Sequence, residues 1–150
     1  MVTIRDARKK DINSIVEFQI NMAEETENLI LHEDVITPGV EAVFLDHNKG
    51  RYFVAEYEGD IAGSLLITYE WSDWRNGMVL WIQSVYVKSE YRGKGIFKAF
   101  YQHIQQIMKE NPEEYKGIRL YVDKTNIGAQ KVYDAVGMNG NHYQLYEWMG

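Results

Sequence analysis

The spacing of apolar residues changes several times along the chain, and each change predicts a new element. Apolar residues that alternate with polar neighbours indicate strands, and those that recur every three or four positions indicate amphipathic helices. A turn signal at Glu58–Gly59–Asp60 predicts a hairpin between two such strands. The expected elements, in chain order, are strand 2–4, helix 12–22, helix 38–45, strands 51–57, 61–71 and 78–87, a helix from 96 to the residues before 111, strand 118–122, helix 126–136 and strand 142–149. This order predicts one mixed α/β domain over residues 1–150.

Two helix starts are predicted from their capping residues. Asp11 stands where its side chain can cap the helix at 12–22. Thr37–Pro38 combines a capping residue with a proline at the first helical position, which predicts that the second helix begins there.

The composition narrows the classes of function. The chain has 150 residues and no cysteine, which excludes disulfides, cysteine ligands and a cysteine nucleophile, and is compatible with a reducing cytoplasm. The net charge of −6 argues against general nucleic-acid binding and favours a cationic substrate, although solubility alone also accounts for it. No apolar run approaches the roughly 20 residues of a membrane span, and the four histidines lack ligand spacing. We therefore expect a cytoplasmic protein with no metal site, no nucleic-acid partner and no membrane partner.

Residues 85–97 carry most of the chemical information. They begin as an alternating strand, turn through Arg92–Gly93–Lys94–Gly95 and enter an amphipathic helix. Glycines between a strand and a helix leave backbone N–H groups uncovered, and these groups, with the helix dipole, favour a bound anion. A glycine turn alone fits a purely steric role equally well, but Arg92 and Lys94 add positive charge here. The stretch lacks the ending of a P-loop and the early βαβ position of a Rossmann fingerprint, so we interpret it as a cradle for the diphosphate of another cofactor.

The run Arg92–Gly93–Lys94–Gly95–Ile96, after a Val-x-Val strand, resembles motif A of the GCN5-related N-acetyltransferase (GNAT) family. The order of expected elements matches that fold over the whole chain. The resemblance implies a mixed, mostly antiparallel sheet with flanking helices, in which strand 78–87 splays from its parallel neighbour 118–122. It also implies acetyl-CoA as co-substrate and, since family members of this size are often dimers, a homodimer.

The same resemblance implies two groups of cofactor-binding residues. The backbone of the strand end would hold the pantetheine arm, and the turn with the helix start would hold the pyrophosphate. One departure is Phe97, where the family usually has Gly or Ala; its ring either rotates into the core or reshapes the adenosine side. The implied residues are Val85, Tyr86, Val87, Arg92, Gly93, Lys94, Gly95, Ile96 and Phe97 from the first group, and Asn126, Ala129 and Tyr133 from the second.

Two residues are candidates for catalysis. In the family, the tyrosine that matches Tyr133 protonates the departing thiolate; the alternative is a helix tyrosine that packs on the sheet. The stretch from Leu80 to Val87 resembles the polyamine and HPA2-like branch, where a Glu occupies the position of Gln83 and deprotonates the amine. A glutamine cannot accept that proton, so Gln83 would orient a water or the amine, and deprotonation would run through water or through Glu70 or Glu33.

Trp71, Trp74 and Trp81 suggest an aromatic and acidic wall that holds a cationic acceptor by cation–π contact, with Glu70 or Asp73 pairing its charge. The alternative is that these rings belong to the core or to a dimer interface. The first hypothesis for function is transfer of acetyl from acetyl-CoA to a primary amine (a small amine, a polyamine or a basic polypeptide) by direct attack in a ternary complex. A second hypothesis is a CoA-binding sensor or interaction module with little catalysis, and a third is transfer from a longer acyl-CoA.

Overall fold

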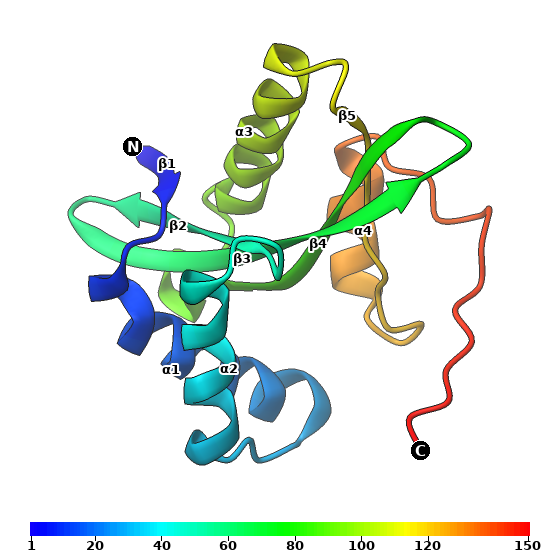
Figure 1. Ribbon diagram of the computed structural model, residues 1–150. Helices are drawn as coiled ribbons and strands as arrows, with labels where there is room; N and C mark the ends of the chain where they lie inside the picture. Colours follow the sequence, from blue (N-terminus) through cyan, green and yellow to red (C-terminus); the bar gives the residue numbers. More distant parts are fainter. The chain divides into compact units, whose positions relative to one another are not determined.

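The computed structural model describes all residues 1–150, which form two units, Met1–Arg119 and Leu120–Gly150. The elements of the first unit are β1 Val2–Asp6, α1 Ile12–Glu27, α2 Glu33–Leu45, β2 Arg51–Tyr57, β3 Asp60–Ser72, β4 Gly77–Val87, α3 Ile96–Glu110 and β5 Tyr115–Arg119, with short 3-10 helices at Lys9–Asp11 and Ser89–Tyr91. The five strands form one sheet in sequence order; all neighbours are antiparallel except β4 and β5, which are parallel (Figure 1). None of the helices is long and apolar enough to cross a bilayer.

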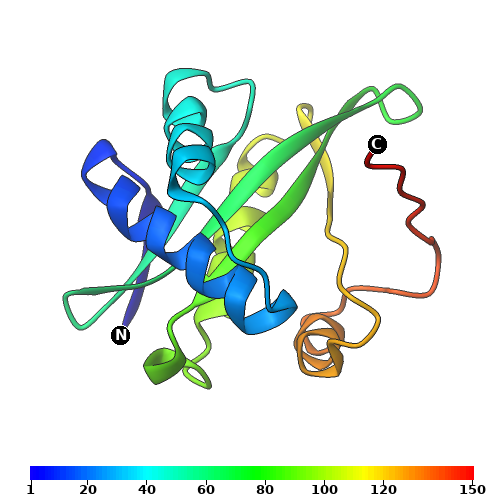
Figure 2. The ribbon, with the colours of Figure 1, turned by 90° about the horizontal axis from the view of Figure 1, so that it is seen from below.

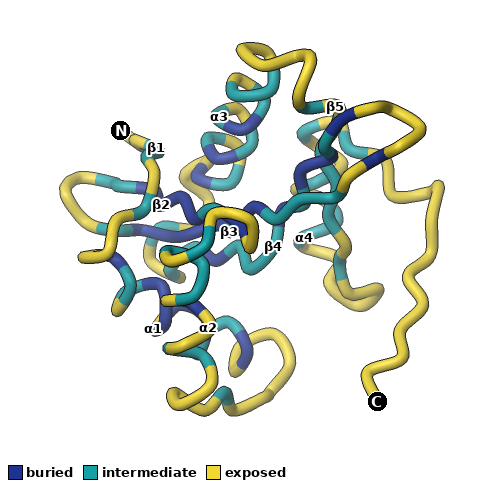
Figure 3. Tube along the Cα trace, viewed as in Figure 1, coloured by how far each residue is buried: buried dark blue, intermediate teal, exposed yellow.

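Helices cover both faces of this sheet. In Figures 1 and 2, α1 and α2 lie on one face and α3 lies on the other. Figure 3 shows that the buried positions follow the central strands and the inward sides of these helices. On the α3 face, the ring of Phe53 meets that of His103 edge-on, with centroids 5.3 Å apart. The cluster on the other face consists of Ile15, Val16, Val40, Tyr52 and Val54. Burial on two faces explains why the central strands are apolar at nearly every position.

A β-bulge interrupts β4. The β3–β4 register shifts between Ser64 and Leu66, so that two β4 residues lie opposite one β3 residue. Ser84, in the shifted stretch, has a left-handed φ of 50°. The extra residue keeps Gln83 and Tyr86 on the same face of the sheet, although three positions apart they would otherwise alternate. This face is the one covered by α1 and α2.

β5 begins three residues earlier than predicted, at Tyr115 instead of residue 118, and ends at Arg119. Its position is set by pairing with the start of β4, because the Met78 N–H donates to the Glu114 carbonyl at 2.8 Å. Gly77 permits this approach, since a Cβ there would lie 3.0 Å from the same carbonyl oxygen. Pairing stops at Trp81–Arg119, so β4 has no strand beside this edge from residue 82 onward. The predicted splay of the parallel pair is therefore present.

α2 also begins earlier than predicted, at Glu33, and Pro38 lies inside the helix instead of at its first position. The His32 carbonyl accepts the N–H groups of Val35 and Ile36, which closes the first turn. Glu33 and Asp34 occupy that turn, where acidic side chains are favoured by the helix dipole. A proline near the start of a helix therefore does not mark the start itself.

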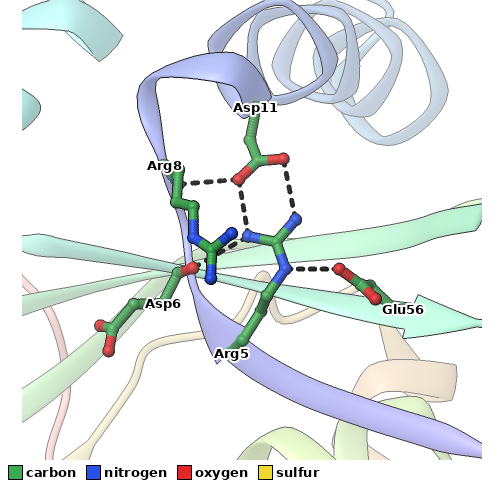
Figure 4. A network of polar contacts seen from close by, with 5 residues as sticks. All are labelled: Arg5, Asp6, Arg8, Asp11 and Glu56. Atoms are coloured by element: carbon green, nitrogen blue, oxygen red, sulfur yellow. Dashed lines mark hydrogen bonds and ion pairs between the residues drawn. The ribbon is translucent and has the colours of Figure 1, made fainter.

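Asp11 stands at the start of α1, as predicted, but its side chain does not cap the helix. Its carboxylate accepts two hydrogen bonds from the Arg5 guanidinium, at 2.8 and 3.0 Å, and one from the Arg8 N–H at 2.7 Å. Arg5 also donates to Glu56 and to the Asp6 carbonyl (Figure 4). This network joins β1, β2 and the start of α1.

The second unit contains one helix, α4 Ile127–Ala135. Gly137 ends it with a φ of 91°, as the sequence predicts, and the Met138 N–H closes the end on the Tyr133 carbonyl at 3.1 Å. The predicted final strand at 142–149 is wrong, because residues 138–150 form neither helix nor strand. An alternating pattern indicates which residues could share a face, but a strand also needs a neighbouring strand for its backbone hydrogen bonds.

Candidate functional site

The turn between β4 and α3 has the backbone conformation that an anion site requires. Gly93 and Gly95 both have left-handed φ values, 79° and 76°. A Cβ at either position would meet no atom within 4 Å, so these glycines serve the backbone conformation and leave the space beside it open. Gly95, the residue before the start of α3, has no side chain to cap the helix, and the Ala99 N–H donates to the Gly95 carbonyl at 3.0 Å. This arrangement fits a diphosphate.

α3 is held in place by its apolar face. Its buried residues are Ile96, Phe100 and Ile104. Phe97 is half-buried and stacks on Tyr101 one turn further along, with ring centroids 6.2 Å apart. Phe97 therefore packs beside Tyr101 of its own helix and is not among the buried residues of α3.

The edge of β4 beside the turn has no neighbouring strand. Val87 is the partner of Gly63, and the next residue, Lys88, donates its N–H to the Ala62 carbonyl at 2.8 Å. Because successive residues of an antiparallel strand point their backbone groups to opposite sides, those of Val87 face away from β3. On that side β5 has already diverged. The backbone of Val87 therefore faces the edge of β4 that β5 leaves open, and Val85 lies within the bulge.

Arg92 folds back toward this edge. Its Nε donates to the Val87 carbonyl at 2.9 Å, and its Nη2 donates to Glu25 at 2.7 Å. The guanidinium also lies 5.5 Å from the centroid of the Tyr86 ring. The Tyr86 hydroxyl donates to the other oxygen of Glu25 at 2.5 Å. These bonds from Tyr86 and Arg92 lower the pKa of Glu25, and burial, together with that contact, raises the pKa of Tyr86 to about 12. Lys94 instead lies over the ring of Tyr57.

Gln83 lies on the face covered by α1 and α2, where its Nε2 donates to the Thr68 hydroxyl at 2.6 Å. The two residues lie on neighbouring strands of the same face. β4 contains no carboxylate. The arrangement can orient a polar group but cannot take up a full proton on this strand.

The predicted aromatic and acidic wall is divided between two faces. Glu70 and Trp81 share the face of Gln83, and the Trp81 Nε1–H donates to Glu70 at 2.7 Å. Trp71, one position after Glu70, points to the opposite face. Trp74 lies in the β3–β4 turn and is 93% exposed. The three rings therefore do not form one surface.

Glu70 is also less available than the sequence suggests. Arg119, opposite Trp81 in the parallel pair, donates to both Glu70 oxygens at 2.9 and 3.0 Å. The bonds from Trp81 and Arg119 lower the pKa of Glu70, so this carboxylate is a weak base whose charge is already paired.

The second unit holds the remaining predicted site residues on α4. Asn126 caps the helix, and its Oδ1 accepts the Ala129 N–H at 3.1 Å. Tyr133 lies two turns further along and is half-buried, and burial raises the pKa of its hydroxyl. A tyrosine with a raised pKa remains protonated near neutral pH and can act as a proton donor.

The contacts of three residues at the site were not predicted from the sequence: Glu25, Thr68 and Arg119. Glu25 belongs to an acidic run that is most simply a solvated helix end, and Arg119 had no distinguishing motif. Thr68 could have been found from strand alternation, because with Gln83 it lies on the polar side of a hairpin. No group of three His, Cys, Asp or Glu side chains is placed to hold a metal ion.

Comparison with known proteins identifies the class. The sequence model of the Acetyltransferase (GNAT) family matches residues 16–138. The chain therefore belongs to the GNAT family, whose α/β fold it has, and it is an acetyltransferase of a family that uses acetyl-CoA.

Solved structures agree with this assignment. A possible acetyltransferase from Clostridium difficile 630 is 45% identical, with a TM-score of 0.90 over 99% of this chain and 97% of that one. Two further structures share the fold at 22% identity. A predicted acetyltransferase with acetyl-CoA from Clostridium acetobutylicum has a TM-score of 0.76, covering 98% of this chain and 96% of that one. A transcriptional regulator from Bacillus halodurans C-125 has a TM-score of 0.81, covering 99% of each chain. A search of curated proteins found no match.

Proposed function

We propose that this protein transfers acetyl from acetyl-CoA to a primary amine by direct attack in a ternary complex, with residues 1–150 acting as one catalytic domain. The observation that carries the proposal is the uncapped start of α3, entered through the left-handed Gly93 and Gly95, beside an edge of β4 that β5 leaves open. The N–H groups from Gly93 to Phe97 would hold the diphosphate, and the backbone of Val85 and Val87 the pantetheine. Bound acetyl-CoA supplies the activated acyl group.

Side chains of the protein would then assist two proton transfers, one to the departing thiolate and one from the amine. The amine nitrogen forms a bond to the acyl carbon as the C–S bond breaks, and Tyr133 would donate its proton to the departing thiolate. The amine must lose a proton, since alkylammonium groups have a pKa of about 10. Gln83, oriented by Thr68, would hold the amine or a water that accepts this proton.

We further propose a cationic acceptor of the polyamine or HPA2-like kind. The stretch from Leu80 to Val87 and the net charge of −6 support this class. The role of Glu70 in this proposal is weaker than the sequence suggested, because its carboxylate already forms an ion pair with Arg119. In the proposal Trp81 and Trp74, more than Glu70, would contact the acceptor.

A thiol-release assay with acetyl-CoA over a panel of primary amines, including polyamines and basic peptides, tests the proposal. We expect turnover of at least one amine and a loss of roughly 100-fold or more in kcat for Tyr133→Phe, the range of general-acid catalysis. Binding of acetyl-CoA without turnover of any amine would instead support a CoA-binding module, to which the absence of a carboxylate on β4 points. Preference for a longer acyl-CoA in the same assay would revise the donor.

A cytoplasmic homodimer is part of the proposal. Large side chains in the tail are strongly exposed, among them Tyr143, Tyr146, Trp148 and Met149 at 74–89%. Such residues often mark protein–protein contacts, and a second copy of the chain is the partner we propose. Light scattering after size exclusion should give twice the chain mass of 17.6 kDa, and deletion of residues 142–150 should give the monomer. A monomeric full-length chain would contradict this.

A further inference from the structure

Arg92, one of the two cationic residues of the β4–α3 turn, is paired with the carboxylate of Glu25. The Arg92 guanidinium donates to Glu25 at the end of α1 and to the Val87 carbonyl on the open edge of β4. Glu25 has a second anchor, since it accepts the Tyr86 hydroxyl at 2.5 Å. Three elements, α1, β4 and the β4–α3 turn, thus meet through one carboxylate.

These contacts compete with the proposed ligand. A guanidinium binds phosphate oxygens through strong, often bidentate, charge-assisted hydrogen bonds. Glu25 and Arg92 are 40% and 48% exposed at their side chains, and exposed ion pairs contribute little to stability. The Val87 carbonyl, which Arg92 covers, lies on the edge proposed for the pantetheine. A diphosphate can therefore displace this pair at small cost.

We infer that Glu25 is a positioning residue that holds Arg92 on the edge of β4 and gives it up to the diphosphate when acetyl-CoA binds. This inference rests on the proposed function. The exchange moves the guanidinium from Glu25 and Val87 to the phosphates, which exposes the Val87 carbonyl. Glu25 keeps its bond from Tyr86, so the end of α1 stays attached to β4 after Arg92 has left.

Removal of the competing carboxylate should tighten cofactor binding. For Glu25→Gln, we expect the Kd for acetyl-CoA, measured by titration calorimetry, to fall about two- to fivefold, since an exposed pair contributes up to about 1 kcal/mol. The matched control is Glu24→Gln, which removes the same charge one residue earlier and contacts neither Arg92 nor Tyr86. The difference in the Kd for acetyl-CoA between Glu25→Gln and Glu24→Gln should shrink at high salt, because salt screens the exposed ion pair between Glu25 and Arg92. A purely structural role for Glu25 would lower the melting temperature without this salt-dependent gain.

The outcomes separate the two proposals. Tighter binding by Glu25→Gln than by Glu24→Gln supports the exchange. Equal or weaker binding by Glu25→Gln, with wild-type protein binding acetyl-CoA normally, overturns the exchange and leaves the cofactor site intact. If wild-type protein fails to bind acetyl-CoA, the proposed function falls and the exchange falls with it.

Discussion

Replacement of Gly95 by alanine tests the cradle most directly. Gly95 has a φ of 76°, and an added Cβ would meet nothing within 4 Å. The cost is therefore backbone strain, about 1–2 kcal/mol for an L-residue in the left-handed region. The lower chain entropy of alanine in the unfolded state offsets about 0.4–1 kcal/mol of it. We expect a net loss of up to about 1.6 kcal/mol in the free energy of unfolding, or a melting temperature lower by up to about 6 °C.

The effect of Gly95→Ala on acetyl-CoA binding should be larger than this strain. If the backbone relaxes so that one N–H no longer reaches a phosphate, the lost charge-assisted hydrogen bond costs about 1.5–3 kcal/mol. This corresponds to a Kd about 10- to 100-fold weaker by titration calorimetry.

A matched control separates strain from loss of the site. Gly59, in the β2–β3 turn, also has a left-handed φ, 88°, and open space around a Cβ. Gly59→Ala should lower the melting temperature by a similar amount and leave the Kd for acetyl-CoA unchanged. Unchanged affinity in Gly95→Ala, or equal loss of affinity in both variants, would refute the assignment of the cradle.

Further predictions concern stability, proton transfer and the acceptor. The hydrogen bonds from Arg5 outweigh burial and lower the pKa of Asp11, so Asp11→Asn should cost about 2–3 kcal/mol of stability at pH 7. In urea unfolding, this gap should begin to shrink near pH 4, where the unfolded carboxylate takes up its proton, and should close as the pH falls through the lowered pKa of the native carboxylate; a constant gap would contradict it. Gln83→Glu should raise kcat/KM at pH 7 by roughly tenfold or more if deprotonation of the amine limits the rate, and an unchanged pH–rate profile would show that it does not. Trp74→Ala should leave the melting temperature unchanged and raise the KM of a cationic amine, which steady-state kinetics with a neutral-tailed amine as control can check.

The parts of the fold that could be predicted depend on local sequence. The β4–α3 turn, α3 and α4 have their determinants within a few residues: glycines at left-handed positions, a capping asparagine at Asn126 and an apolar stripe. The errors occur where distant residues decide. β5 is placed by its pairing with Gly77–Trp81, and the tail alternates without a partner strand. The bulge at Ser84 had no signal, because a serine in the left-handed region is chosen by its surroundings.

The same distinction applies to the site. Sequence spacing predicted the glycine turn that enters α3, because its backbone conformation belongs to one continuous stretch. It could not predict how the charges pair, because the partners come from other elements. Glu70 pairs with Arg119 from β5, and Arg92 pairs with Glu25 from α1.

These pairings bear on how the amine loses its proton. Two carboxylates that contact β4 side chains are already engaged: Glu70 has Trp81 and Arg119, and Glu25 has Tyr86 and Arg92, and these contacts lower the pKa of both carboxylates. A carboxylate with a lowered pKa is a weaker base than an ordinary one. β4 itself contains no carboxylate, and Gln83 cannot accept a full proton. Glu33, the other carboxylate considered from the sequence, lies in the first turn of α2. In the proposed mechanism, water oriented by Gln83 and Thr68 would therefore accept the proton, and the protein would position the amine more than deprotonate it.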